Sequence, residues 1–322
     1  MPLVQVLGTG GTIASHGQES GGAVASSSVD DLMTGALDDV EVRTRDVMMT
    51  GSYRLGLSDL RKVVASIEAE AADPRLDGIV VTHGTDTLEE SAFLAELVRQ
   101  GPAPVVFTGA QRTPDEPDAD GPRNLHDAIR AASASVTRGW GSVVCFNGRI
   151  HSSRGVFKSH TLASNAFTGC TVLAEIFGRN VYAEAAPARR PILPQPDENF
   201  DSVRVEIIPV FPGSDPSLMD WCIDAGAHGV VLLGTGSGNA GPGYCDVVRR
   251  AVAAGVPVIL ASRVPFGPIR PLYGNGGGVD LERAGAVPAG TLGPYQARIL
   301  TALLISHGFR GREFTHEFTR RL

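Results

Sequence analysis

The sequence is poor in cysteine, and its few cysteines are widely spaced. Four occur among 322 residues, and no two of them form a CxxC pair. They are Cys145, Cys170, Cys222 and Cys245. Scattered cysteines of this kind indicate buried free thiols in a reducing compartment, rather than a disulfide framework or a zinc site.

Basic residues and long apolar segments are also scarce. The formal net charge is −7, which disfavours nucleic acid or an anionic membrane as the main partner. No stretch reaches the roughly 18 uninterrupted apolar residues that a transmembrane helix needs. The opening MPLVQVLGTGGTIA predicts a strand and a turn, without the features of a signal peptide. We therefore expect a cytoplasmic protein with no nucleic-acid or membrane partner.

The usual patterns for metals and phosphates are missing as well. The eight histidines are scattered and form no HExxH motif, so no metal site is expected. The Gly-rich turn LGTGGTIAS at 7–15 lacks the lysine of a Walker loop, and Ile13 replaces the third glycine of a dinucleotide-binding turn. A second Gly-rich turn, GTGSGNAG at 234–241, indicates binding through backbone and small side chains. We expect no cofactor.

Short runs of Val, Ile and Leu alternate with helical stretches. In the first half, strands are predicted at 2–8, 78–84, 104–110 and 141–148. Such continuous apolar strands, separated by amphipathic helices, indicate parallel βαβ units covered on both faces. The helix predicted over 88–98 places its apolar residues close to one stripe, with Glu89, Glu90 and Glu96 largely off it.

A Pro-rich stretch interrupts this pattern. Residues 183–202 carry four prolines and no apolar periodicity, as is typical of a linker between domains. Beyond it, strands are predicted at 203–211, 229–238 and 256–264, and helices around 216–226, 243–254 and 295–308, the last closing the chain. The sequence predicts two α/β domains. The larger, 1–182, has a mainly parallel sheet with Gly-rich strand-end turns, and the smaller is 203–322.

Polar residues gather where two predicted strands end. Thr9 and Thr12 follow the first strand, and THGTDT at 82–87 ends the strand at 78–84. The carboxyl ends of parallel strands meet at one sheet edge, where open α/β folds bind ligands. We therefore expect the two threonine turns to be neighbours. Within the second turn, we interpret His83 as a buried strand-end histidine rather than a base.

The turn at 82–87 has a structural and a catalytic interpretation. As a structural turn it would use Thr87 as a helix N-cap, with an acidic first helical turn that complements the helix dipole. As a catalytic turn it would use Thr85 and Asp86 together with Lys158. A lysine beside an aspartate can take up a hydroxyl proton, so these residues would supply a base and an orienting carboxylate.

Both turns resemble the signatures of one enzyme family. TGGTIA at 9–14 and HGTDT at 83–87 are similar to those of the bacterial-type L-asparaginase/glutaminase family, which also includes the amidohydrolase subunit of an archaeal tRNA-dependent amidotransferase. The similarity continues in order along nearly the whole chain, through GAQR at 109–112, DGPRNL at 120–125, SRVP at 262–265 and GTL at 290–292.

The resemblance implies a reaction and its catalytic residues. Thr12 would be the nucleophile, and Thr85, Asp86 and Lys158 would activate it. The implied reaction is hydrolysis of L-asparagine to L-aspartate and ammonia through a threonine acyl-enzyme. A glutaminase or other small-amide hydrolase is the alternative within the family, and a low-turnover amino-acid-binding protein on the same fold is a further alternative.

The resemblance also implies a set of substrate-binding residues. Ser52 and Asp86 would hold the α-carboxylate and α-amine, and backbone N–H groups near Thr12 and Ala110 would stabilise the oxyanion. The full predicted set is Gly11, Ser52, Gly84, Thr85, Asp86, Ala110, Asn239 and Asn275. Family members are typically homotetramers built from tight dimers, so a homotetramer or homodimer is implied.

The chain departs from the family pattern after Thr12. The loop at this point usually carries a tyrosine that contacts the nucleophile, but residues 15–28 contain none, and the first tyrosine of the chain is Tyr53. His16, Ser20 or one of the serines at 26–28 could replace it. The glycines and serines predict a mobile loop that gates the site.

A second departure lies in the smaller domain. Many members bind the α-amine with an acidic residue of a neighbouring subunit, and the equivalent stretch here, 271–285, has no clear match. Asn275 is the nearest polar residue and Asp280 the nearest acid, whereas Asn239 fits the asparagine of the family's second domain. The preference between L-asparagine and L-glutamine therefore stays open.

Overall fold

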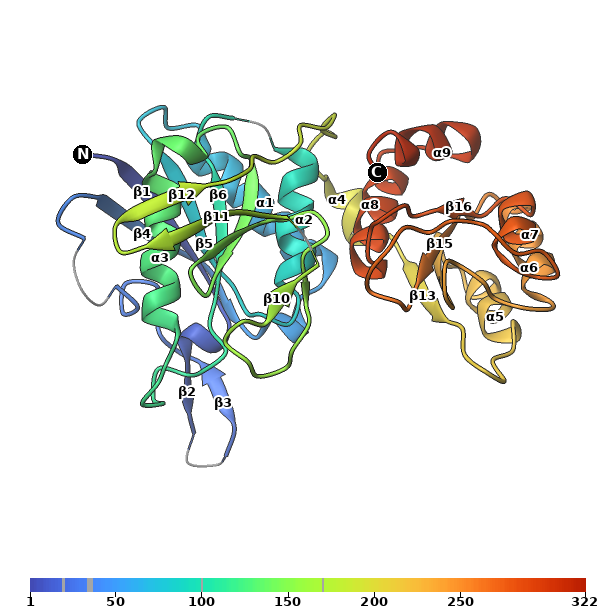
Figure 1. Cartoon of the computed structure of the whole chain (residues 1–322), viewed down its shortest axis with the longest axis horizontal. Coiled ribbons are helices and arrows are strands. Elements are labelled where there is room, and N and C mark those ends of the chain that lie inside the picture. The colour runs from blue at the N-terminus through green and yellow to red at the C-terminus, as the bar shows by residue number, and fades with distance from the viewer. Residues whose placement is uncertain (19–20, 34–36, 100, 170) are drawn as a thin grey trace. The chain divides into compact units, whose positions relative to one another are not determined.

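The protein is a two-unit α/β structure. It is known from a computed structural model, which describes residues 1–18, 21–33, 37–99, 101–169 and 171–322. The two compact units are Met1–Gln195 and Pro196–Leu322 (Figure 1). The division between them falls inside the Pro-rich stretch 183–202, and the predicted fold class of two α/β domains is confirmed.

An eight-stranded sheet forms the centre of the first unit, in the order β12-β11-β8-β7-β6-β5-β1-β4. Its parallel part consists of β4 (Glu41–Thr50), β1 (Leu3–Gly10), β5 (Gly78–Thr82), β6 (Val105–Thr108) and β7 (Ser142–Phe146). Its antiparallel part consists of β8 (Arg149–Ser152), β11 (Val172–Phe177) and β12 (Asn180–Ala183). The mainly parallel sheet was predicted, whereas its antiparallel extension was not.

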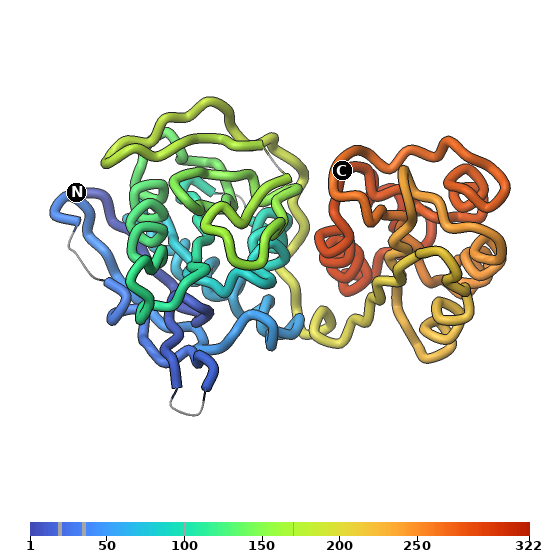
Figure 2. The backbone as a smooth tube through the Cα atoms, turned by 60° about the horizontal axis from the view of Figure 1, so that its bottom comes forward, coloured from blue at the N-terminus to red at the C-terminus, as the bar shows by residue number. Residues whose placement is uncertain are grey.

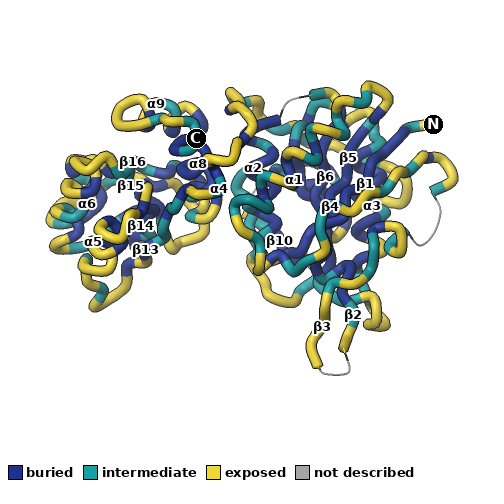
Figure 3. Tube along the Cα trace, turned by 180° about the vertical axis from the view of Figure 1, so that it is seen from behind, coloured by how far each residue is buried: buried dark blue, intermediate teal, exposed yellow. Residues whose placement is uncertain are grey.

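Helices cover both faces of this sheet. On one face, α3 (Gly121–Ser133) packs its Ala128 and Ile129 against Val6 and Val80 in a common core cluster. On the other face lie α1 (Leu57–Ala71) and α2 (Leu88–Val98), which contact each other. The central strands β1, β5 and β6 are therefore buried on both sides, as Figure 3 shows in dark blue. This burial explains their continuous apolar sequences.

Two short antiparallel ribbons lie outside the main sheet. β2 (Ser15–Gly17) pairs with β3 (Ala23–Ala25), and β9 (Phe157–Lys158) pairs with β10 (Phe167–Thr168). The first ribbon extends from the sheet as the dark blue hairpin in Figure 2. The segment predicted as a loop over 15–28 thus begins as a hairpin, and Ser20, a predicted replacement for the missing tyrosine, lies outside the described residues.

The second unit is a smaller α/β layer structure. Its parallel sheet has the order β13 (Val205–Pro209), β14 (Gly229–Gly234), β15 (Val258–Ser262) and β16 (Val287–Pro288). Its helices are α4 (Glu198–Asp201), α5 (Ser217–Asp224), α6 (Tyr244–Ala253), α7 (Gly278–Arg283), α8 (Pro294–Ser306) and α9 (Gly311–Thr319). The predicted closing helix is α8, but it does not close the chain. The short α9 follows it and buries Phe314 and Phe318.

The cysteines are free thiols where the structure describes them. Cys145 and Cys222 are buried, as predicted, whereas Cys245 is half-buried and Cys170 lies outside the described residues. Within the described ranges, no helix is long and apolar enough to cross a membrane.

Candidate active site

A pocket of about 210 Å³ lies at the carboxyl ends of β1 and β5. Its walls come from the turns that follow β1, β4 and β5, together with part of the β2–β3 hairpin. The predicted site residues that line it are Gly11, Thr12, Ser52, Gly84, Thr85 and Asp86. The two threonine turns therefore meet at one edge of the sheet, as the strand pattern predicted.

Three of these turns are packed backbone against backbone. A Cβ atom on Gly11 would lie 2.4 Å from Gly84 Cα, and one on Gly84 would lie 2.6 Å from Ser52 Oγ. Gly11 also has a φ of 81°, which L side chains rarely adopt. A larger residue at either glycine would push the turns apart. Ser52 is buried beside them, and its hydroxyl has no hydrogen-bond partner among the described residues.

Lys158 joins the two polar residues at the end of β5. Its Nζ donates to Thr85 Oγ1 at 2.8 Å and to Asp86 Oδ1 at 2.8 Å. The lysine lies on β9, opposite Phe167 of β10, and its side chain is 16% exposed, against 54% for Asp86. The ion pair therefore connects a sheltered ammonium group with a carboxylate at the mouth of the pocket.

Gln111 fixes the direction of the Thr85 hydroxyl. Because Lys158 donates to Thr85 Oγ1, the hydroxyl hydrogen of Thr85 is left to donate to Gln111 Oε1, which lies 2.9 Å away. The Gln111 amide nitrogen in turn donates to three carbonyl groups of the turn 160–163, at 3.2 to 3.4 Å. Gln111 thus ties Thr85 to the segment that follows Lys158.

Thr12 differs from Thr85 in its hydrogen bonding. It begins the short 3-10 helix Thr12–Ala14, is half-buried and lines the pocket. Its hydroxyl makes no hydrogen bond to any residue that the structure describes. Thr9, by contrast, is buried and donates to the Thr82 carbonyl at 2.8 Å, so it braces β1 against β5.

Glu89 holds the backbone of Lys158. Its Oε2 accepts a hydrogen bond from the Lys158 N–H at 2.7 Å. The sequence pattern placed Glu89 off the buried stripe of its helix, but the structure buries it. Burial, with the charge of Glu90 as a second cause, raises the pKa of Glu89 to about 8. The first turn of α2, which directly follows the THGTDT turn, therefore anchors β9.

Comparison with known protein families decides the identity of this site. Residues 3–189 match the model of the asparaginase N-terminal domain, and residues 204–318 match that of the glutaminase/asparaginase C-terminal domain. The chain belongs to the asparaginase family. Its class of chemistry is that of an amidohydrolase.

Individual members of the asparaginase family are similar along their whole length. The chain is 34% identical to the probable L-asparaginase of Deinococcus radiodurans, covering 99% of this chain and 98% of that protein. It is 31% identical to the probable periplasmic L-asparaginase of Haemophilus influenzae, covering 95% and 89%. A solved structure of the probable cytoplasmic L-asparaginase of Campylobacter jejuni superposes with a TM-score of 0.86 at 25% identity, covering 99% and 100%.

Two residues of the asparaginase signature at 83–87 have structural tasks. His83 is fully buried; its Nδ1 donates to the Gly84 carbonyl at 2.8 Å and its Nε2 accepts from Ser91 Oγ at 2.9 Å. The predicted burial of His83 is confirmed, and this burial lowers the pKa of His83 to about 4. Thr87 occupies the N-cap position of α2, but its hydroxyl donates to the Ser52 carbonyl at 3.0 Å instead of capping the helix.

The other predicted substrate-binding residues are not among those that line this pocket. Ala110 belongs to the first unit and is fully buried. Asn239 belongs to the second unit, where its Oδ1 accepts from the Gly278 N–H at 3.0 Å. Asn275 of the same unit is exposed and has a left-handed φ of 55°. Their contact with substrate stays a prediction.

The described side chains predicted to replace the missing tyrosine do not line the pocket. His16 bonds to Asp115 Oδ1 at 2.7 Å and to Ser27 Oγ at 2.6 Å. None of the serines at 26–28 lines the pocket, where the hairpin presents Ala23 to Ala25 instead. The tyrosine on the pocket wall is Tyr53, which is 74% exposed. Among the described residues no cluster of metal-ligating side chains is found.

The raised pKa of Glu89 predicts a pH dependence of stability. Between its ordinary value of 4.5 and its folded value of about 8, folding takes up a proton, so the free energy of unfolding falls as pH rises through this window. The Glu89→Gln variant does not show this decrease in the free energy of unfolding, because a glutamine side chain does not titrate. From about pH 5 to about pH 8, we expect the Tm of the wild type to fall by several degrees relative to Glu89→Gln. A Tm difference that does not change with pH, or that changes equally for the exposed control Glu184→Gln, would contradict the assignment.

Gln111 generates a second prediction. Gln111→Met removes the acceptor of the Thr85 hydroxyl and the three bonds to the turn 160–163, so we expect kcat for amide hydrolysis to fall by roughly 10- to 100-fold with little change in KM. The matched control is Gln195→Met, which removes a glutamine whose amide bonds the Val98 carbonyl at 3.4 Å. Equal kinetics for the two variants would show that Gln111 does not position Thr85.

Proposed function

We propose that this member of the asparaginase family hydrolyses L-asparagine to L-aspartate and ammonia through an acyl-enzyme on Thr12. One observation carries the choice of nucleophile. The Thr85 hydroxyl is engaged on both sides, by Lys158 and by Gln111, whereas the Thr12 hydroxyl has no partner among the described residues and faces the same pocket. A hydroxyl that must attack a carbonyl carbon needs this freedom.

In the proposed reaction, Thr12 Oγ1 attacks the side-chain amide carbon of the substrate. Lys158 acts here in its amine form, toward which the Thr85 hydroxyl turns from its resting acceptor, Gln111 Oε1. The proton of Thr12 passes to Thr85 Oγ1 as the Thr85 proton passes to Lys158, and Asp86 balances the ammonium group that results. Backbone N–H groups at the start of the 3-10 turn have no intrahelical acceptors, and they can therefore bind the oxyanion. The proton is returned to the leaving nitrogen, ammonia departs, and water hydrolyses the Thr12 ester to L-aspartate.

The pocket favours a small amino acid as substrate. Its volume of about 210 Å³ is below the ~300 Å³ at which drug-sized ligand sites begin. The half-exposed Asp86 carboxylate suits the α-amine. The hydroxyl of Ser52, which has no hydrogen-bond partner among the described residues, suits the α-carboxylate. L-glutamine, one methylene longer, is the alternative substrate, since a methylene changes selectivity by only about 1–3 kcal/mol.

We also propose a cytoplasmic homo-oligomer. Free, buried cysteines fit a reducing compartment. Asn239 and Asn275, the predicted amine ligands, belong to the second unit, and a dimer or tetramer in which subunits complete each other's pockets would give them this role. The small-molecule substrate is then the main partner, with no nucleic acid or membrane involved.

The proposal is tested by ammonia release from L-asparagine and L-glutamine with a matched pair of variants. Thr12→Val removes the proposed nucleophile, and we expect kcat to fall by roughly 10⁴-fold or more. Thr9→Val makes the same change three residues earlier, at a hydroxyl that only bonds to Thr82, and should cost about 1 kcal/mol of stability but little activity.

Activity that survives Thr12→Val would contradict the mechanism. If the wild type releases no ammonia from either amino acid, yet binds L-asparagine in calorimetry, the protein is instead a low-turnover amino-acid-binding protein. A higher kcat/KM for L-glutamine than for L-asparagine would retain the mechanism and replace the substrate.

A further inference from the structure

A second and larger pocket lies in the first unit, at the opposite ends of the strands from the candidate active site. Its volume is about 440 Å³, within the ~300–1,000 Å³ range of small-molecule sites. Gly101 and Pro102 precede β6, and residues 139–142 lead into β7, so the pocket lies at the amino ends of these strands. The candidate active site lies at the carboxyl ends. None of the residues that line one pocket lines the other.

Positive charge dominates the lining of this second pocket. Five arginines contribute to it, and among the described residues of the wall Glu96 is the one acidic side chain. The arginines are Arg99, Arg138, Arg154, Arg189 and Arg190. They come from separate segments of a chain whose formal net charge is −7, so the pocket is a local reversal of the protein's charge.

Several of these arginines are held in place by acidic partners. Arg99, with 5% of its side chain exposed, pairs with Glu68 at 2.7 Å, and the more exposed Arg138 pairs with Asp77 at 3.1 Å. Arg154, which is 10% exposed, pairs with Glu96 at 3.2 Å and lies over the Phe93 ring. These contacts fix guanidinium groups in a partly desolvated wall, where an anion is bound more strongly than at an open surface.

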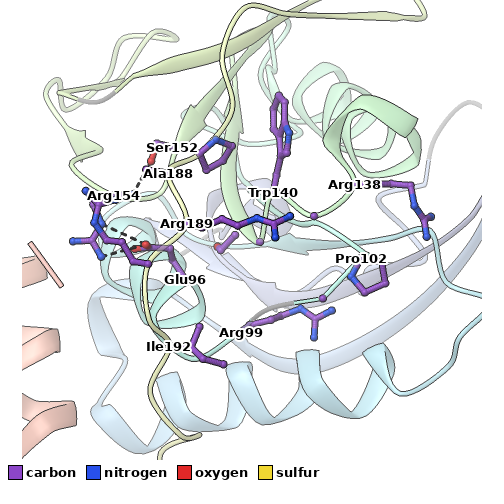
Figure 4. A pocket seen from close by; sticks show the side chains of 16 residues that line it. Glu96, Arg99, Pro102, Arg138, Trp140, Ser152, Arg154, Ala188, Arg189 and Ile192 are labelled. Atoms are coloured by element: carbon purple, nitrogen blue, oxygen red, sulfur yellow. Dashed lines mark hydrogen bonds and ion pairs between the residues drawn. The ribbon is translucent and has the colours of Figure 1, made fainter. Parts of the chain in front are cut away.

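Arg189 of this pocket is exposed and forms no ion pair with any described residue. Its Nη2 lies 3.6 Å from the position that a Cβ atom would take on Gly139. Figure 4 shows its guanidinium reaching into the space between the segments that carry Trp140 and Arg99. The N–H groups of this guanidinium donate to no described residue and can bind a ligand. We call the pocket lined by the five arginines the arginine pocket.

The chemistry of the lining selects the class of ligand. The Trp140 side chain belongs to the hydrophobic core cluster and is only 9% exposed, so it does not provide a platform for a nucleobase. Guanidinium forks match the oxygens of phosphate groups, and each phosphate supplies three acceptor oxygens and about two negative charges. Arginines from several segments therefore suit a compact phosphate better than a neutral or aromatic molecule.

We propose that this arginine pocket binds a compact phosphate-containing ligand. The inference concerns a site separate from the proposed amide hydrolysis, and it stands whether or not L-asparagine is the substrate. The phosphate group would lie against Arg189 and Arg138, with Arg99 and Arg154 as the sheltered cations behind them.

Isothermal titration calorimetry with inorganic pyrophosphate tests the site at fixed, low ionic strength. We expect saturable binding of one pyrophosphate per chain, and an affinity about tenfold or more weaker in Arg189→Ala because a charge-assisted hydrogen-bond donor is lost. Arg249→Ala removes the same charge from an exposed position in the second unit, and it should bind as the wild type does.

Citrate provides the comparison anion. Weaker binding of citrate than of pyrophosphate supports the choice of phosphate, whereas equal or tighter binding of citrate overturns it. No saturable binding of pyrophosphate, or equal affinity in the wild type and Arg189→Ala, overturns the site itself. Unchanged Tm values for both arginine variants confirm that each remains folded.

Discussion

The ammonium group of Lys158 is the interaction on which the site depends. Two segments that are far apart in the sequence meet at this charge, since β9 carries the lysine and the turn after β5 carries Thr85 and Asp86. A third segment, the turn after β6, joins them through Gln111, which accepts a hydrogen bond from Thr85. A sheltered charge is costly unless it is paired and hydrogen-bonded, so the segments cannot separate without leaving that charge unsatisfied. The same pairing that stabilises the fold also sets the direction of the Thr85 hydroxyl.

Close backbone contacts complete the arrangement. Gly11 and Gly84 allow the turns after β1 and β5 to approach until no side chain fits between them. The first turn of α2 then holds β9 through the carboxyl of Glu89. The site is thus built from turns held by neighbouring strands and a helix, which keeps reacting groups in place better than a free loop would. The part of the pocket wall that the β2–β3 hairpin forms differs, because this hairpin lies outside the main sheet.

The sequence predicted those elements whose structure depends on a local pattern of apolar residues. The continuous apolar runs predicted β1, β5, β6 and β7, and the helical periodicity of 88–98 predicted α2. The strand-end rule predicted that Thr12 and Thr85 would share a pocket. The antiparallel strands β8, β11 and β12 were not predicted. Their pairing depends on tertiary contacts, and short, half-buried strands have no clear local sequence pattern. The short helix α9 was missed for a related reason, since two buried phenylalanines in a charged stretch form too brief a pattern.

The site itself shows the same division. Residue types and spacing identified the threonine turns and Lys158, but they gave no hydrogen-bond directions. Thr87 was expected to cap its helix and bonds to Ser52 instead, and Glu89 was expected at the surface and is buried. Nothing in the spacing of GAQR signalled that Gln111 would accept the hydrogen of Thr85. Such tasks depend on which segments the fold brings together, and that information is not local.

The most direct test is to trap the acyl-enzyme. The protein is mixed with L-asparagine, quenched in acid within milliseconds, digested and mapped by mass spectrometry. The account predicts an aspartyl ester on the peptide that contains Thr12, and fragmentation should place it on Thr12 itself. An ester on Thr85 would contradict it. So would the release of more than one ammonia per chain with no ester on either threonine.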